Sequence, residues 1–276
     1  MNKNLISILD ISKSEILNLF EIAHMGKQIF TEYPDVLKDK VLASLFFQPS
    51  TRTQLSFQSS FIRLGGKYIG FSNINESRSG PPYYEPVDDL GKIVSLYCDV
   101  IVMRTIEQNK MLELCKTATV PIISAGSGNV EHPTQTLTDL YTIQKCHGSI
   151  SNNNILIVGT PRQRTINSFL IGLNYWDNIN IHILCQEGVE ISTRVKQYTP
   201  KHSIKYYNSI EQLIDSNILN SISVLYMDKI FYETEINNNF VLNTNQWQML
   251  KNDVIILHPL PRTNELPKYI DTMPQA

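Results

Sequence analysis

The feature that most constrains this chain is a regular alternation of short apolar runs with stretches of helical spacing. Apolar runs occupy residues 41–47, 99–104 and 154–158, and a stretch with helical spacing follows each of them. A short continuous apolar run is typical of a strand that is buried on both faces. Strands that alternate with helices imply parallel sheets covered by helices on both faces. The sequence therefore predicts an α/β fold.

The expected elements follow one another along the whole chain. A first helix should begin after Ser12, because the spacing of Ser12 and Glu15 indicates a capping box. Strands are expected at residues 41–47, 68–71, 99–104, 120–125, 154–158, 179–184, 223–227 and 253–257. Helices are expected at residues 53–64, 87–97, 110–116, 134–145 and 210–216, and after Arg164.

The length of 276 residues suits either one large domain or two of roughly 130 residues each. The segment 146–153 is polar, contains glycine and separates two runs of alternating elements. We predict that it links two α/β domains, at residues 1–146 and 147–276.

Composition excludes several classes of protein. A hydrophobic fraction of 42% argues against disorder. A net charge of −2 argues against a dedicated nucleic-acid-binding protein. We expect no membrane span and no signal peptide, since no apolar run is long enough. The four cysteines form no CxxC pair, which disfavours a zinc site or disulfides and favours a reducing, cytoplasmic setting.

Polar residues with a common chemistry follow the predicted strands. In parallel sheets, ligands bind at the carboxyl ends of the strands. The residues expected there are 50–53, 104, 132–135, 162–164, 228–229 and 258–262. This set is rich in arginine, histidine and hydroxyl groups and poor in carboxylates. It predicts a pocket for an anion.

The first motif, Ser50–Thr53, lies between a predicted strand and a predicted helix. Free backbone N–H groups and the helix dipole favour a phosphate at such a place, and Arg52 can bind phosphate oxygens bidentately. A plain N-cap with one surface arginine explains the motif equally well. No G-x-x-x-x-G-K-[ST] or G-x-G-x-x-G sequence occurs, which argues against the common nucleotide sites.

Two further motifs follow later strands. His132 and Gln135 open a predicted helix, where the alternative is a capping turn with proline at the first helical position. No cysteine, aspartate or second histidine stands at ligand spacing, so a metal site is not expected. In His258-Pro-Leu-Pro-Arg262, two prolines fix a non-helical backbone whose carbonyl groups can face a cleft, or which simply forms a rigid exit loop.

The order of these motifs resembles the aspartate and ornithine carbamoyltransferases over nearly the whole chain. The segments that carry the resemblance are FFQPSTRTQLSFQSSFIRLGG, DVIVMR, AGSGNVEHPTQTLTDLYTI and HPLPR. HPTQ and HPLPR resemble the aspartate branch, whereas the HCQP-type and D-x-x-x-S-M-G signatures of the ornithine branch are missing. The resemblance implies transfer of a carbamoyl group from carbamoyl phosphate to an amino acid, without metal or organic cofactor. It also implies a homotrimer and a role in pyrimidine biosynthesis, and it leaves an additional regulatory subunit open as a partner.

The resemblance also assigns roles to residues. The first domain would bind carbamoyl phosphate and the second the amino acid. Phosphate would be bound by Ser50, Thr51, Arg52 and Thr53. The carbonyl oxygen would be contacted by Thr53, Arg104 and His132, and the carbamoyl NH2 by Gln135 and the backbone carbonyls of Pro259 and Leu260. Donors aimed at the carbonyl oxygen form an oxyanion hole, so Arg52, Thr53, Arg104 and His132 are the expected catalytic residues.

The chain departs from the family at the acceptor side. Arg164 matches the arginine that binds a carboxylate of aspartate. Where the aspartate enzymes have arginine and, two residues later, glutamine, this chain has Lys229 and Phe231. Lysine cannot form the arginine fork. We therefore expect a pocket less suited to the side-chain carboxylate of aspartate.

A second departure lies in the loop 72–85, which in the family supplies a serine and a lysine across a subunit interface. Ser79 matches the serine, but the lysine position falls on Tyr83. We expect Arg78 of the same loop to replace the lysine. The alternative is a mobile surface loop rich in glycine and proline.

Three functions remain open. An active carbamoyltransferase with a modified acceptor pocket is favoured, because every expected carbamoyl-phosphate residue is present. A catalytically inactive paralogue that serves as a subunit or scaffold is favoured by Lys229, Phe231, Tyr83 and an ending, TNELPKYIDTMPQA, that lacks the family's returning helix. A transferase that uses a different acyl phosphate is the third.

Overall fold

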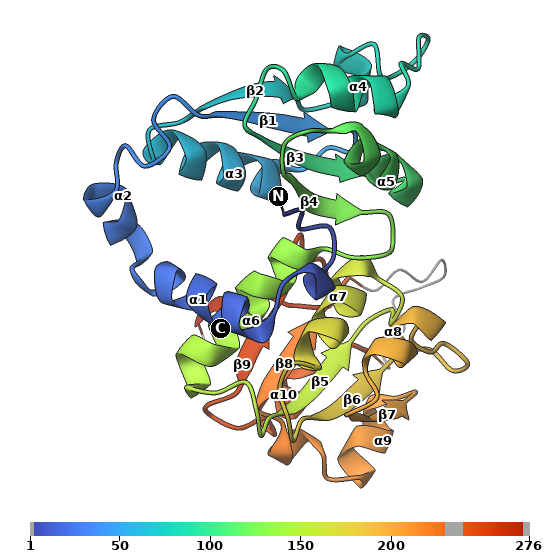
Figure 1. Cartoon of the computed structure of the whole chain (residues 1–276). Coiled ribbons are helices and arrows are strands. Elements are labelled where there is room, and N and C mark those ends of the chain that lie inside the picture. Colours follow the sequence, from blue (N-terminus) through green and yellow to red (C-terminus); the bar gives the residue numbers. More distant parts are fainter. Residues whose placement is uncertain (1–2, 230–239, 273–276) are drawn as a thin grey trace. The chain divides into compact units, whose positions relative to one another are not determined.

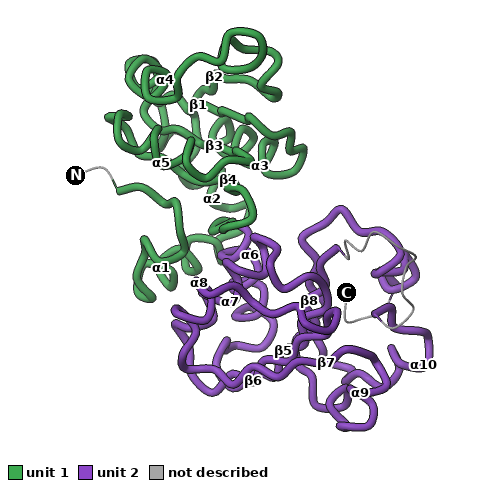
Figure 2. The backbone as a smooth tube through the Cα atoms, turned by 90° about the vertical axis from the view of Figure 1, so that its right-hand side faces the viewer, with its two compact units in different colours: residues 1–134 green, residues 135–276 purple. Residues whose placement is uncertain are grey.

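The structure, a computed structural model, describes residues 3–229 and 240–272. The chain forms two compact units, residues 1–134 and 135–276 (Figure 2). This division falls just before the third residue of a helix that begins at Pro133, whereas the predicted boundary at 146/147 lies near the end of that helix. The predicted boundary stays a prediction. Each unit is described by itself below.

Unit 1 contains a four-stranded parallel sheet in the order β2-β1-β3-β4 (Figure 1). Its strands are β1 (Val41–Phe46), β2 (Lys67–Phe71), β3 (Val100–Thr105) and β4 (Ile122–Ser127). Its helices are α1 (Lys13–His24), α2 (Ile29–Glu32), α3 (Thr51–Arg63), α4 (Val87–Val94) and α5 (Gln108–Thr117). The capping box of Ser12 and Glu15 starts α1, as predicted.

Alternate residues of the strands in unit 1 face two separate cores. Ala43 and Leu45 of β1 pack with residues of α4 and α5, whereas Leu42 and Phe46 pack against aromatic residues of α3. Successive side chains of a strand point to opposite faces, so a strand buried on both faces must be apolar throughout. This is why β1 is a continuous apolar run.

Unit 2 contains a five-stranded parallel sheet in the order β7-β6-β5-β8-β9. Its strands are β5 (Asn154–Val158), β6 (Asn180–Leu184), β7 (Ser203–Tyr207), β8 (Val224–Met227) and β9 (Ile255–Leu257). Its helices are α6 (Pro133–His147), α7 (Arg164–Leu173), α8 (Thr193–Tyr198), α9 (Ile210–Asp215) and α10 (Thr244–Trp247).

One face of the second sheet packs against α9, α10 and the segment near Ile270 in a single apolar cluster. On the other face, Phe169 of α7 stacks on Tyr226 of β8 with ring centroids 4.6 Å apart. Helices thus cover both faces, and the α/β fold predicted from the alternating pattern is confirmed. Four elements, α2, α8, β7 and α10, lie where no element was expected.

Candidate active site

In unit 1, neighbouring strands β1 and β3 form a topological switch point. The chain leaves β1 into α3 on one face of the sheet and leaves β3 toward α5 on the other. Their carboxyl ends lie side by side, since Phe46 pairs with Arg104. Two loops that diverge from adjacent strand ends leave a crevice, where ligands of open α/β sheets bind.

The first turn of α3 borders this crevice. The helix begins at Thr51, two residues earlier than expected, so Thr51, Arg52 and Thr53 all lie in its first turn. Ser50 is the N-cap residue, yet its side chain makes no capping hydrogen bond with the helix. A plain N-cap would use the Ser50 hydroxyl to accept from the first turn of the helix, and this hydrogen bond is not formed.

Arg104, at the end of β3, is held on two sides. Its Nε donates to Oε1 of Gln48 over 3.2 Å, and its NH1 nitrogen donates to the Ala125 carbonyl over 3.3 Å. Gln48 lies two residues after the end of β1, and Ala125 belongs to β4. Arg104 is thereby fixed at the carboxyl edge of the sheet. The sequence reasoning missed Gln48, although it directly follows the apolar run of β1.

His132 lies at the start of α6 and is buried, with Nδ1 3.4 Å from the Thr134 hydroxyl. The preceding Glu131 anchors the loop to the N-terminal segment. Its carboxylate accepts from the Ser7 hydroxyl at 2.6 Å and from the Ile8 N–H at 3.0 Å. Its backbone carbonyl accepts from the Ser127 N–H at 3.1 Å. These contacts hold His132 close to the end of β4, and Glu131 is a second residue that the sequence reasoning missed.

Unit 2 repeats the arrangement at strands β5 and β8, whose chain connections again diverge. Gly159 directly follows β5 and has a φ of 145°, and a Cβ there would lie 3.3 Å from Cβ of Asp228. Glycine thus permits the close approach of the two strand ends. Arg164, the first residue of α7, is half-buried. Burial lowers its pKa, and the nearby Asp228 acts in the opposite direction.

Asp228 and Lys229 follow β8 directly. The buried Asp228 carboxylate accepts from the Thr165 hydroxyl and, at 2.7 Å, from the Lys229 N–H. Burial raises the pKa of Asp228, and these two hydrogen bonds oppose the rise. Lys229 is half-buried next to it. Phe231, the other residue predicted for the acceptor, lies outside the described residues.

Gln135 projects from the first turns of α6, and its Nε2 donates to Asp139 Oδ1 over 2.9 Å. The Tyr226 hydroxyl donates to the other oxygen of Asp139 over 3.2 Å. Burial raises the pKa of Asp139 to about 7, although both hydrogen bonds lower it. The sequence reasoning missed Asp139, but its spacing of four residues from Gln135 on one helix was an available signal.

The HPLPR motif forms a rigid turn after β9. The Leu260 N–H donates to Nδ1 of His258 over 2.8 Å, so the ring proton must sit on Nε2, which lies 3.1 Å from Glu265. Burial lowers the pKa of His258, which favours the neutral ring. Leu260 itself adopts a φ of 55°, uncommon outside glycine. The carbonyls of Pro259 and Leu260 are thus carried on a constrained, non-helical backbone.

The loop 72–85 is organised by its own contacts. The Ser79 side chain is buried and donates to Glu85 over 3.3 Å. The guanidinium of Arg78 lies 5.0 Å from the centre of the Tyr83 ring, and both residues are exposed. Arg78 therefore places its charge beside the position that the resemblance assigns to lysine.

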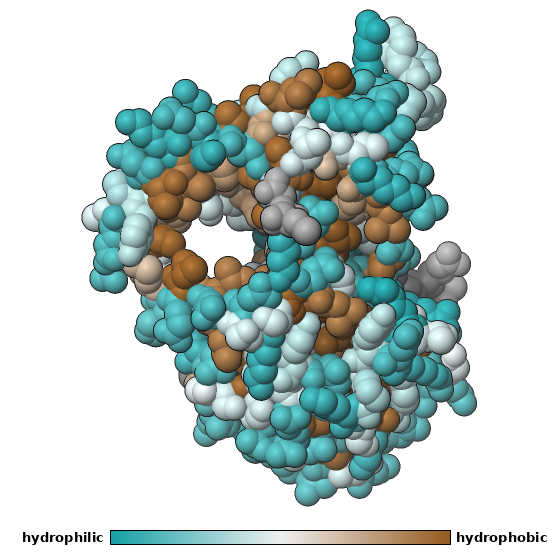
Figure 3. Space-filling model, in the orientation of Figure 1, coloured by the Kyte–Doolittle hydropathy of each residue, from teal (hydrophilic) through white to brown (hydrophobic). Residues whose placement is uncertain are grey.

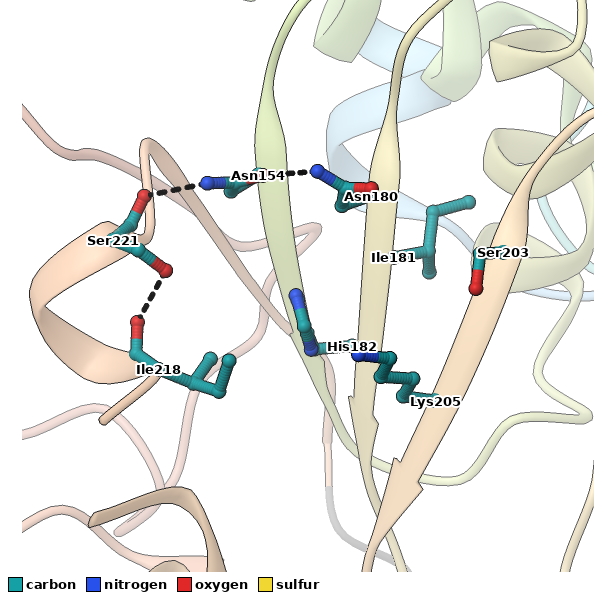
Figure 4. Close-up of a pocket in the computed structure, with 8 residues that line it drawn as sticks. All are labelled: Asn154, Asn180, Ile181, His182, Ser203, Lys205, Ile218 and Ser221. Atoms are coloured by element: carbon teal, nitrogen blue, oxygen red, sulfur yellow. Dashed lines mark hydrogen bonds between the residues drawn. The ribbon is translucent and has the colours of Figure 1, made fainter. Parts of the chain in front are cut away.

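A separate pocket of about 230 Å³ lies at the amino ends of β5, β6 and β7 (Figure 4). It is lined by Asn154, Asn180, Ile181, His182, Ser203, Lys205, Ile218 and Ser221. These strand ends are opposite to the carboxyl ends that carry Arg164 and Lys229, so this pocket is distinct from the candidate site.

Within residues 3–229 and 240–272, no three His, Cys, Asp or Glu side chains are grouped to hold a metal, and no helix could cross a membrane.

Comparison with known proteins gives consistent matches. Residues 3–145 match the family model described as "Aspartate/ornithine carbamoyltransferase, carbamoyl-P binding domain". An aspartate carbamoyltransferase catalytic subunit of Azobacteroides pseudotrichonymphae is 38% identical, with 99% of this chain and 91% of that protein covered. The corresponding subunit of Clostridium novyi is 34% identical, with 98% and 89% covered.

Solved structures agree with these relatives. Aspartate transcarbamoylase from Trypanosoma cruzi, crystallised with carbamoyl phosphate and aspartate, matches with a TM-score of 0.88 and 27% identity. The match covers 100% of this chain and 90% of that one. The same enzyme with phosphate and aspartate matches with a TM-score of 0.89.

Proposed function

Because this chain belongs to the aspartate/ornithine carbamoyltransferase family, we propose that it transfers the carbamoyl group of carbamoyl phosphate to the amine of an amino acid, aspartate or a related acceptor. In this reaction the amine attacks the carbonyl carbon, a tetrahedral intermediate forms, and the bond to the phosphate oxygen breaks. Phosphate leaves and the amine loses a proton. The relatives described above are all active transferases by name, so nothing among them favours the inactive paralogue.

The observation that best supports the proposal is the arrangement at the carboxyl edge of β1 and β3. The first turn of α3, with Ser50 as a cap residue whose hydroxyl does not cap, offers donors for the phosphate group. Arg52, Thr51 and Thr53 belong to the same turn. We assign the phosphate of carbamoyl phosphate to this turn, where Arg52 also offsets the charge that develops on the leaving group.

The carbonyl oxygen is assigned to Thr53, Arg104 and His132. Negative charge develops on this oxygen as the amine attacks, and fixed donors are most effective where charge appears in the transition state. Arg104 is fixed by Gln48 and Ala125, so it does not need to reorganise during the reaction. The carbamoyl NH2 is assigned to Gln135 and to the carbonyls of Pro259 and Leu260.

The acceptor is assigned to Arg164 and Lys229, with Phe231 as the third predicted contact. Both cations suit the carboxylates of an amino acid. The ammonium group of Lys229 is a point charge, unlike the planar guanidinium of arginine, so it constrains a second carboxylate less.

We therefore expect Lys229→Arg to lower the KM for aspartate by about tenfold, the value of one added charged hydrogen bond. Steady-state kinetics of the two proteins with aspartate measures this, and an unchanged KM would remove Lys229 from the acceptor site.

The proposal includes a homotrimer in which the loop 72–85 serves a neighbouring subunit, with or without a regulatory subunit. It also includes a cytoplasmic location and a role in pyrimidine biosynthesis. Large apolar side chains of unit 1 support an interface there, since Leu55, Ile62, Tyr68 and Ile69 are exposed. Figure 3 shows apolar residues on the surface of this unit. Patches of this kind commonly mark protein contacts.

The deciding experiment is calorimetric titration with carbamoyl phosphate, followed at saturation by a phosphate-release assay. The assay uses a panel of amino acids that includes aspartate and ornithine. Binding followed by release with one amine supports the proposal and identifies the acceptor. Arg52→Ala should abolish carbamoyl-phosphate binding and phosphate release. Arg63 is another exposed arginine of α3, and Arg63→Ala should change neither binding nor release. Absence of carbamoyl-phosphate binding would exclude the enzymatic function.

A further inference from the structure

Gln135 is held by a buried carboxylate that the proposed reaction itself does not use. Gln135 and Asp139 lie four residues apart on α6, and the amide Nε2 donates to Asp139 Oδ1 over 2.9 Å. Asp139 is 4% exposed. Burying a carboxylate is costly unless hydrogen bonds compensate for the lost water, so its position calls for an explanation beyond helix formation.

A second donor fixes the carboxylate from the sheet. The Tyr226 hydroxyl donates to Asp139 Oδ2 over 3.2 Å. Tyr226 is fully buried, and its ring stacks on Phe169 at an interplanar angle of 19°. The tyrosine therefore has little freedom, and it fixes the plane of the Asp139 carboxylate against which Gln135 is oriented.

The chemistry of the carboxylate determines which way the Gln135 amide points. The Gln135 Nε2 group can only donate, and it is the atom that contacts Asp139 Oδ1. The amide must therefore turn its NH2 group toward Asp139, which places the carbonyl oxygen Oε1 on the opposite side. A carbamoyl NH2 group is a donor and needs an acceptor of this kind.

We propose that Asp139, supported by Tyr226, is the positioning residue that orients the Gln135 amide so that its Oε1 accepts from the NH2 group of carbamoyl phosphate. The inference rests on the proposed function, from which it takes the contact between Gln135 and the carbamoyl group. In the absence of Asp139 the amide can rotate and present its own NH2 to that of the substrate, where two donors repel. Asp139 thereby contributes to the choice of a carbamoyl over another acyl group.

Acetyl phosphate separates this role from a merely structural one, because it carries a methyl group where carbamoyl phosphate carries NH2. We expect Asp139→Ala to weaken binding of carbamoyl phosphate about 10- to 100-fold, as for a buried NH2 donor left without its acceptor. Binding of acetyl phosphate should stay within about twofold, because a methyl group makes no hydrogen bond to Gln135. Calorimetric titration of both ligands gives the two values.

Conservative variants keep the test informative if Asp139→Ala does not fold. In Asp139→Asn, the side-chain oxygen still accepts from Gln135 while the new NH2 group donates to Tyr226, so carbamoyl-phosphate affinity should return close to that of the unmodified protein. Tyr226→Phe should weaken carbamoyl phosphate alone, by a smaller factor. Asp177→Ala, an exposed aspartate of the same unit that pairs with Lys201, is the matched control and should change neither ligand.

The outcomes distinguish this inference from the proposed function. If the unmodified protein binds no carbamoyl phosphate, the proposed function fails. If it binds carbamoyl phosphate but Asp139→Ala weakens both ligands equally, the positioning role is wrong and the function stands. Asp139→Ala should add nothing to the loss caused by Gln135→Ala, because both changes remove one interaction. Additive losses would also overturn the inference.

Discussion

Arg104, Gln135 and His258 illustrate how single residues of the candidate site are arranged. Each of these side chains has a polar partner. Arg104 is held by Gln48, Gln135 by Asp139 one turn further along α6, and His258 by Glu265. Each partner restricts the orientation of the group before any ligand binds. Preorganisation of this kind is what makes donors effective in a transition state.

His132→Ala tests the oxyanion role at this scale. We expect kcat to fall about 10²- to 10³-fold, the usual effect of removing one oxyanion donor. The dissociation constant of carbamoyl phosphate should change far less, because the charge appears only in the transition state. Stopped-flow or steady-state kinetics combined with calorimetry measures both. Equal losses in affinity and turnover would assign His132 to ground-state binding.

The ionisation of Asp139 predicts a pH-dependent stability. Burial raises the pKa of Asp139 from its ordinary value of 3.8 to about 7 in the folded chain. The titratable groups that face it are Tyr226 and Asp228. The folded state therefore binds more protons between pH 4 and 7, and the contribution of this group to the free energy of unfolding falls as pH rises through that range.

Asp139→Asn removes this titration. The quantity to compare is the free energy of unfolding of the variant minus that of the unmodified protein. This difference should be about 2–3 kcal/mol larger at pH 8 than at pH 5. Urea denaturation at the two pH values gives this difference, in which groups that titrate equally in both proteins cancel. The same difference at both pH values would show that Asp139 is not the titrating group.

Single residues also show what the sequence could and could not predict. Ser50–Thr53, Arg104 and Arg164 are predicted site residues because they lie at or after the ends of apolar runs, and this position can be read from the sequence. Gln48, Glu131 and Asp139 were missed because their roles depend on contacts with distant or buried groups. Glu131, for example, bonds to Ser7 and Ile8 more than 120 residues away.

At the scale of elements, most strands were predictable because both their faces are buried. β7 (Ser203–Tyr207) was missed because it is an edge strand with mixed exposure, so its residues do not form an apolar run. α8, α10 and α2 are only one to two turns long and carry little periodicity. The start of α3 was placed at residue 53, since a polar first turn has no apolar periodicity to mark it.

The loop 72–85 carries a prediction at this scale. If Arg78 serves the phosphate site of a neighbouring subunit, Arg78→Ala should raise the KM for carbamoyl phosphate about tenfold or more, as for the loss of one charged contact. Arg63→Ala provides the control, because Arg63 also lies over an aromatic ring, that of Phe30, outside the loop.

Mixing two impaired chains, assayed at carbamoyl phosphate concentrations below the raised KM of Arg78→Ala, locates the contact. When Arg78→Ala and Arg52→Ala chains are unfolded together and reassembled, some sites receive Arg52 from one chain and Arg78 from its neighbour. We expect part of the phosphate-release activity to return in the mixture. Activity no higher than the average of the two separate variants would place Arg78 in its own subunit's site or in none.

At the scale of the whole molecule, the chain consists of two units with independent sheets and cores. Each sheet has its own switch point, with predicted carbamoyl-phosphate residues at one and predicted acceptor residues at the other. The matches to catalytic subunits extend over nearly the full chain, so they include both units. The assignment of substrates to the two units remains part of the proposed function.

The proposed homotrimer predicts the mass of the molecule in solution. Sedimentation equilibrium should give three times the chain mass of 31.6 kDa across the micromolar range. Replacing the exposed Leu55 and Ile62 of α3 with serine tests whether this apolar surface contributes to the assembly. A single-chain mass for the unmodified protein would contradict the trimer and, with it, the shared loop.

The position of Lys229 on the loop after β8 bears on how such enzymes diversify. The side chain stands outside the apolar cluster that stabilises unit 2, so exchanging it disturbs few packing contacts. Substitutions at position 229 should therefore leave the fold of unit 2 intact. If Lys229 contacts the acceptor as proposed, exchanges at this one position alter the preferred amine while the residues predicted for carbamoyl phosphate stay unchanged.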